Sequence, residues 1–207
     1  MSPHQSPERP TGGWQTARVL ALPYRDRELR DIAEGYLRHE IVTLCGQVRE
    51  LREWNATGSL LAPVHDALLE APLLHFLVLD DFLGTRPVIA RGDVGAQHYF
   101  PGRSLAPVLT RQEREELEAQ LQLGRPRRPL QDWDHDDITA RLCEAFVGFT
   151  QSLDRHPEPA VRRRGEWFVE ASLVAHAFDL EVRTDTFVIS LRDEDEPAPA
   201  EPLSGSR

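Results

Sequence analysis

The chain has 207 residues, of which 40% are hydrophobic and 28% charged, and these values are typical of a single globular domain. Its formal net charge of −10 excludes broad, non-specific DNA binding, which relies on a basic surface. The longest apolar stretch, residues 67–83, is interrupted by acids, a proline and a histidine, which excludes a membrane span. DNA and membranes are therefore not expected partners.

The composition also limits the cofactors and the compartment. All 24 basic residues are arginines, so Schiff-base chemistry on a lysine is excluded. Cys45 and Cys143 are too few for a zinc cluster and lie in apolar helical patterns, which predicts buried free thiols. The first residues have neither the basic nor the apolar region of a signal peptide, which predicts a cytoplasmic protein. We expect no cofactor and no metal.

Both ends of the chain have the composition of disordered tails. Residues 1–13 are rich in proline and glycine, and residues 193–207 are acidic and rich in proline and alanine. The sequence between them, residues 14–192, predicts a single helical-bundle domain.

The first half of this domain predicts two long helices. Apolar residues recur at steps of three and four from about Asp26 to Asn55, which is typical of one helical stripe. A second helix ends at Leu83 before Gly84 and is apolar on nearly every face from Ala67 onward. We expect it to be the central helix, buried on all sides. Asp80 and Asp81, near its end, are expected to pair with arginines, Arg86 and Arg91 being candidates.

The second half predicts shorter helices. After a long loop over residues 85–109, Thr110 and Glu113 form a capping-box pattern that begins a charged helix at 110–123. Asp136 or Asp137 is expected to cap a helix over residues 138–153, and a further helix covers residues 160–177.

The last ordered segment has a different period. The apolar residues alternate with polar ones over 178–182 and again over 187–191, which predicts a small β-hairpin. The fold expected overall is mainly α, a bundle of about five helices with a small C-terminal β-hairpin and disordered tails.

Two short motifs follow each other in the middle of the chain. The first has the form H-x-x-x-L-x-D-F-L and the second D-V-x-A-x-x-Y-F, and their residues are His75, Leu79, Asp81, Phe82 and Leu83, then Asp93, Val94, Ala96, Tyr99 and Phe100. With these motifs, residues 30–155 resemble the HEPN-like helical domains of bacteria. The resemblance implies a four- or five-helix bundle that often dimerises. Many HEPN domains act as metal-independent RNases in defence and toxin–antitoxin systems.

HEPN nucleases use an arginine and a histidine separated by four to six residues. The histidine moves a proton and the arginine holds the phosphate and its developing charge. Arg128 and His135 have this spacing and precede the helix expected at 138–153, and Arg91 and His98 form the alternative pair. The usual N-x-x-x-A-H-L context is absent. We therefore predict a non-catalytic HEPN-like binding or regulatory module, with a metal-independent endoribonuclease as the alternative.

Other polar clusters admit a structural and a functional interpretation. The arginines at 125, 127 and 128 and those at 162–164 could bind a phosphate or an acidic partner, or could be solvated. The acids and histidine of Trp133–Asp137 favour a helix cap over a metal site. His75 is expected to be a core histidine bonded to a neighbour.

The expected partners follow from the length of the first helix. About 30 residues span about 45 Å, more than the width of a small bundle. Its stripe continues to Leu51 and Trp54, which predicts apolar surface that one protomer does not cover. We predict a homodimer, with a partner protein as a further binding candidate and RNA as the substrate of the alternative function.

Overall fold

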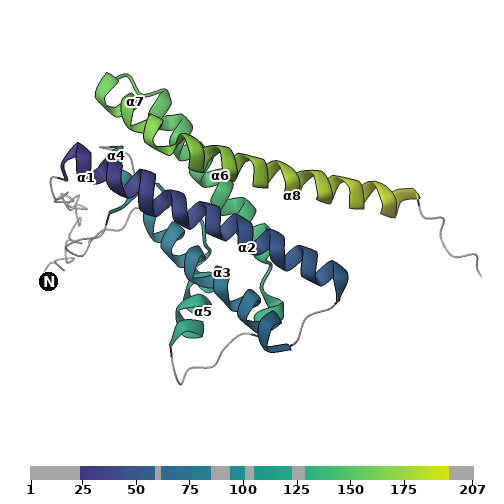
Figure 1. Cartoon of the computed structure of the whole chain (residues 1–207). Helices are drawn as coiled ribbons and strands as arrows, with labels where there is room; N and C mark the ends of the chain where they lie inside the picture. Colours follow the sequence, from purple (N-terminus) through teal and green to yellow (C-terminus); the bar gives the residue numbers. More distant parts are fainter. Residues whose placement is uncertain (1–23, 59–61, 85–93, 101–104, 123–128, 196–207) are drawn as a thin grey trace, which may run out of the picture.

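A computed structural model of the chain describes residues 24–58, 62–84, 94–100, 105–122 and 129–195, with side chains as far as residue 185. This part is mainly helical, which confirms the mainly α character of the predicted fold, and it contains no strand (Figure 1). No helix within it is long and apolar enough to cross a membrane. The predicted tail at 1–13 and residues 196–207 lie outside the described part, while residues 193–195 belong to the last helix.

The first long helix is present. It consists of α1 (Asp26–Asp31), a π-helical segment (Ile32–Leu37) and α2 (Arg38–Thr57), and it ends at Gly58, whose φ of 65° is the left-handed conformation of a helix C-cap. The stripe is buried, and its buried members are Leu29, Ala33, Leu37, Ile41, Leu44, Cys45, Val48 and Leu51. The expectation of uncovered apolar surface at Leu51 is therefore wrong, because the bundle itself covers this residue.

Helix α3 (Ala62–Leu83) is central but not buried on all sides. Leu73, Phe76 and Leu79 are fully buried, and α3 packs against α2, α5 and α6. Leu74 is 54% exposed, because its face of α3 points away from these three helices. The expectation of complete burial is thus wrong for one face of the helix.

Two further helices follow α3 within the described residues, and the second of them packs against α3. They are the short helix α4 (Ala96–Tyr99) and then α5 (Arg111–Leu121), which begins with the predicted capping box. The hydroxyl of Thr110 accepts the N–H of Glu113 at 3.2 Å, and the Glu113 carboxylate accepts the N–H of Thr110 at 2.7 Å. Asp80 pairs with Arg114 of α5 at 2.6 Å, and the candidates Arg86 and Arg91 lie outside the described residues.

Helix α6 (His135–Asp154) begins earlier than predicted. Its cap is Asp134, not Asp136 or Asp137, because the Asp134 carboxylate accepts the N–H of Asp137 at 2.9 Å. A 3-10 turn (Leu130–Asp132) precedes it. Asp136 and Asp137 instead lie in the first turn, where the helix dipole favours acids.

The chain ends in α7 (Pro159–Gly165), a 3-10 turn (Glu166–Phe168) and the long helix α8 (Val169–Asp195). Phe178 to Val182, expected as the first strand of the hairpin, lie within α8 instead. Phe178 and Val182 are four residues apart and both face the core, so the alternating pattern also fits a helix. The second expected strand, 187–191, falls where side chains are not described.

Helix α8 lies beside α2 and packs on α6 (Figure 1). Arg38 of α2 pairs with Glu170 at 2.5 Å, and Arg49 pairs with Glu181 at 2.8 Å, so the two helices run in the same direction. The C-terminal end of α8 projects past the end of α2 (Figure 1). One side of α8 therefore closes the bundle, and the opposite side faces outward.

Candidate functional site

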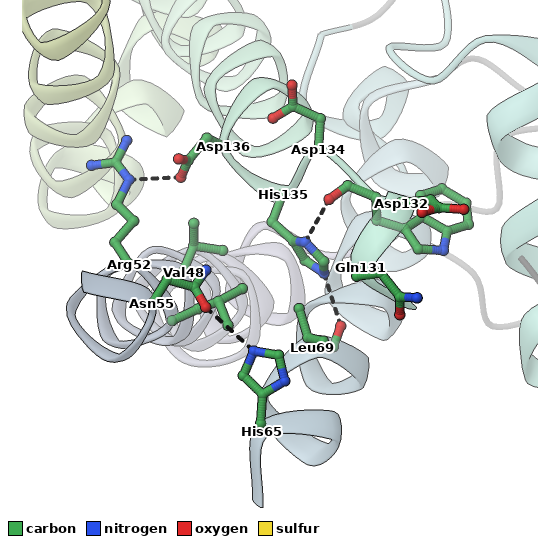
Figure 2. Close-up of a pocket in the computed structure, with 12 residues that line it drawn as sticks. Val48, Arg52, Asn55, His65, Leu69, Gln131, Asp132, Asp134, His135 and Asp136 are labelled. Carbon is green, nitrogen blue, oxygen red and sulfur yellow. Dashed lines mark hydrogen bonds and ion pairs between the residues drawn. The ribbon is translucent and has the colours of Figure 1, made fainter. Parts of the chain in front are cut away.

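A polar groove of about 420 Å³ lies where α2 ends and where α3 and α6 begin (Figure 2). It contains His135, the candidate catalytic histidine. The other polar side chains that line it are Arg52 and Asn55 from α2, His65 from α3, and Gln131, Asp132, Asp134 and Asp136 around the start of α6. A substrate of His135 would therefore have to bind in this groove.

The start of α6 fixes the position of His135. Trp133 is buried, and the Asp134 cap sets the first turn of the helix directly after it. His135 follows as the first helical residue and points toward α3 (Figure 2). The buried Trp133 and the Asp134 cap thus fix the backbone at His135 and the direction in which its side chain points.

Both ring nitrogens of His135 face backbone acceptors. Nδ1 lies 2.9 Å from the carbonyl oxygen of Trp133, and Nε2 lies 2.8 Å from the carbonyl oxygen of Leu69 on α3 (Figure 2). The residue is only 6% exposed. A general acid or base needs a ring nitrogen within reach of the substrate proton. In this arrangement His135 instead ties the start of α6 to α3.

The groove is acidic. Among its described lining residues, Asp132, Asp134 and Asp136 contribute three carboxylates and Arg52 one guanidinium. The guanidinium of Arg52 bonds Asp136 at 2.7 Å and Glu181 at 3.0 Å, so its charge is balanced by carboxylates of the protein itself. Its charged plane also lies over the ring of Phe178, 5.2 Å from the ring centre. Among the described lining residues, acidic side chains therefore outnumber basic ones.

The arginines predicted for binding are not part of the described groove. Arg125, Arg127 and Arg128 lie outside the described residues, as does Arg91 of the alternative pair. The structure therefore places the histidine of each predicted pair but not its arginine.

His98 of the alternative pair is also engaged in local structure. The N–H of Gly95 donates to its Nδ1 at 3.0 Å, which closes the N-terminal turn of α4. The ring of Tyr24 packs edge-on against it, with ring centres 5.1 Å apart. His98 is buried, and this contact set is that of a helix cap.

The residues that carry the HEPN resemblance are mainly core residues. Leu79, Phe82, Leu83, Ala96 and Tyr99 are all buried. The Tyr99 hydroxyl donates to the carbonyl oxygen of Leu29 at 2.7 Å, and burial raises the pKa of this phenol. These residues join α3 and α4 to the first helix and do not form a site.

Two further sequence candidates have structural partners. The Nδ1 of His75 lies 2.6 Å from a carboxylate oxygen of Glu40 on α2, which confirms the expected core histidine. Arg164, the last of the run at 162–164, donates to the carbonyl oxygen of Tyr99 at 3.2 Å and to Asp26 at 2.8 Å. Within the described part, no group of three or more His, Cys, Asp or Glu side chains is placed to hold a metal ion.

Sequence reasoning missed the groove residues of α2 and α3. Arg52 and Asn55 lie at the end of one helix and His65 at the start of the next, and the Nε2 of His65 lies 3.3 Å from the Asn55 amide oxygen. No local motif marks them, because the groove forms only when α6 packs across this helix pair.

Comparison of the chain with protein-family models, with curated proteins and with solved structures finds no match. The HEPN resemblance consequently stays a prediction that rests on the motif residues alone.

Proposed function

We propose that this chain is a non-catalytic binding or regulatory module of the HEPN-like kind, which acts by associating with a second copy of itself or with a partner protein. The observation that carries the proposal is the environment of His135. Its ring nitrogens lie 2.9 Å and 2.8 Å from two backbone carbonyl oxygens, and its side chain is buried. A histidine held in this way supports the bundle and is poorly placed to transfer protons.

The charge of the groove supports the same proposal. An RNase must hold a phosphate beside its histidine, and it does so with arginine side chains. Here Asp132, Asp134 and Asp136 surround His135, and Arg52 is bound to acids of α6 and α8. As far as the described side chains go, this charge balance favours a cationic or neutral group over the RNA backbone.

Association is supported by apolar surface elsewhere. Val169, Leu173 and Leu180 on α8 are large apolar residues with more than half of their surface exposed. Contiguous apolar surface on a small domain is typical of a protein-binding face.

We also propose a cytoplasmic location. The sulfur atoms of Cys45 on α2 and Cys143 on α6 lie 3.6 Å apart, and both thiols are free and buried. Neighbouring free thiols are preserved in a reducing compartment.

The deciding experiment is an RNA cleavage assay. Purified protein is incubated with total RNA in EDTA, beside the variants His135→Ala and Arg128→Ala and the control variant His65→Ala, which alters the same groove at its exposed edge. We expect no cleavage above the buffer blank by any of the four. Cleavage by the native chain and by His65→Ala that is lost in both other variants would overturn the proposal and establish the alternative, a metal-independent endoribonuclease.

A further inference from the structure

The outward side of α8 carries large apolar side chains that are not covered within the described part of the chain. Val169 is 53%, Leu173 65% and Leu180 51% exposed. The opposite side of the same helix is the one that enters the core, through Phe168, Ala171, Ala175 and Phe178. The solvent side of a bundle helix is ordinarily polar, so this side has the composition of a contact surface.

The exposed residues follow a coiled-coil spacing. We define the α8 seam as Glu166 of the preceding 3-10 turn together with Val169, Leu173, His176, Leu180 and Arg183 of α8, all of which are exposed. Successive members are three, four, three, four and three residues apart, which is the spacing of the contact positions of a coiled coil. The series reads the same in both directions. The contact positions of two identical helices that run antiparallel therefore have the same spacing and can pair along the whole seam.

We propose that two copies of this chain associate by antiparallel pairing of their α8 seams. The inference rests on the proposed function and names the partner of the module as a second copy. In this register Leu173 packs against His176 of the second copy, and Val169 packs against Leu180 of the second copy. The paired region, from Glu166 to Arg183, is about 25 Å long.

The charges at the two ends of the seam select the antiparallel direction. Within the described part, Glu166 forms no ion pair. Arg183 is 57% exposed and bonds Asp179 at 2.8 Å and Glu144 at 3.1 Å. Antiparallel pairing brings Glu166 of each copy to Arg183 of the other, whereas parallel pairing sets Glu166 against Glu166. Opposite charges that meet across an interface fix its register, and like charges disfavour it.

The surface beside the seam fits the same partner. A groove of about 420 Å³ lies at the start of the seam and is lined by Glu34, Arg38, Glu166, Trp167, Val169 and Glu170. It offers the ring of Trp167 and the carboxylate of Glu166, which suit an arginine side chain, while Glu170 is already paired with Arg38. In the antiparallel pair, the second copy brings the Arg183 end of its own α8 to this groove.

Cysteine cross-linking tests the register. In the double variant Val169→Cys with Leu180→Cys, each new thiol lies beside the other position of the second copy. Within one chain the two positions are about 16 Å apart along the helix, too far for a disulfide. Under a mild oxidant we expect a covalent dimer of the double variant on a non-reducing gel. Val169→Cys alone and the native chain, whose thiols are buried, stay uncross-linked. A covalent dimer of the single variant, or none of the double variant, overturns the register.

A second pair of variants tests the surface without relying on cross-linking. Leu173→Glu places a charge in the middle of the seam, and Leu74→Glu places one on a leucine of α3 that is 54% exposed, against 65% for Leu173. Sedimentation equilibrium at micromolar concentration should give one chain for Leu173→Glu and two for Leu74→Glu. A Leu173→Glu dimer overturns the seam, yet leaves the proposed function standing with another surface. RNA cleavage that is lost in His135→Ala and Arg128→Ala would contradict the proposed function whatever the mass of the protein. The two failures are therefore distinguishable.

Discussion

The imidazole Nε2 of His135 lies 2.8 Å from the backbone carbonyl oxygen of Leu69, so the first residue of α6 is bonded to the middle of α3. The same ring reaches back to the carbonyl oxygen of Trp133 at 2.9 Å. A residue that sequence spacing marks as a nuclease histidine is thereby part of the framework of the bundle. Its replacement should consequently affect folding, and not a reaction.

Replacing His135 by alanine removes this tie. The contact with the Leu69 carbonyl is lost and the buried imidazole leaves a cavity, whereas the Trp133 carbonyl keeps the backbone N–H of residue 135. We expect the free energy of unfolding to fall by about 2 kcal/mol. The measurement is urea unfolding followed by circular dichroism. His65→Ala serves as the control, because His65 is partly exposed and makes one longer bond of 3.3 Å; it should change stability by less than about 0.5 kcal/mol. Equal free energies of unfolding for the two variants would show that the His135 bonds do not stabilise the fold.

The two leucines of α3 should respond very differently to truncation. Leu79 is fully buried, so Leu79→Ala leaves a cavity and should cost about 2–5 kcal/mol. Leu74 is 54% exposed, so Leu74→Ala should cost less than about 1 kcal/mol. Urea unfolding compares them directly. A large loss at Leu74 would mean that another surface covers this face of α3 in solution.

Asp80 organises the contact between α3 and α5. One of its carboxylate oxygens accepts the N–H groups of Val108 and Leu109 at 2.7 and 2.9 Å, and the other bonds Arg114 at 2.6 Å. Because the carboxylate is fully buried, Asp80→Ala leaves these donors unpaired and should cost about 3–5 kcal/mol. Glu118→Ala removes only the exposed partner of Arg114, 3.1 Å away, and is the matched control. A thermal or urea midpoint unaffected by Asp80→Ala would contradict this role.

Glu113 contributes to the pH dependence of stability. Burial alone would raise the pKa of this carboxyl, but the bonds from Arg141 and from the Thr110 N–H outweigh burial and lower the pKa. A lowered pKa in the folded state stabilises the fold above the unfolded value of about 4.3, and this contribution is lost as the pH falls further. Unfolding free energies measured between pH 6 and pH 3 should therefore fall less steeply for Glu113→Gln than for the native chain. Parallel profiles would contradict this contribution.

Local patterns predicted much of the fold. The capping box of Thr110 and Glu113 and the end of α3 at Leu83 are present, because each depends on a few neighbouring residues. Residues 178–182, expected as a strand, are helical, because Phe178 and Val182 satisfy both a strand and a helix period. The cap at Asp134 was missed because four aspartates fall within residues 132–137 and any of them could cap the helix. The hydrogen bond from the Asp137 N–H to the Asp134 carboxylate decides between them.

The candidate site was less predictable than the fold. Spacing singled out His135 but could not show that its two nitrogens meet carbonyl groups, since one of these belongs to Leu69, 66 residues earlier in the sequence. Nor does any motif show that Arg52 bonds acids of α6 and α8. The exposed face of α8 was likewise hidden, because only the packed bundle shows which side of an apolar helix remains outside.

The proposed association of the chain is tested most directly by its mass in solution. Light scattering of the native protein, recorded over a range of micromolar concentrations, should give the mass of two chains at the upper end and fall toward one chain on dilution. A mass of one chain that does not change on concentration would contradict both the homodimer and the pairing of α8 with a second copy.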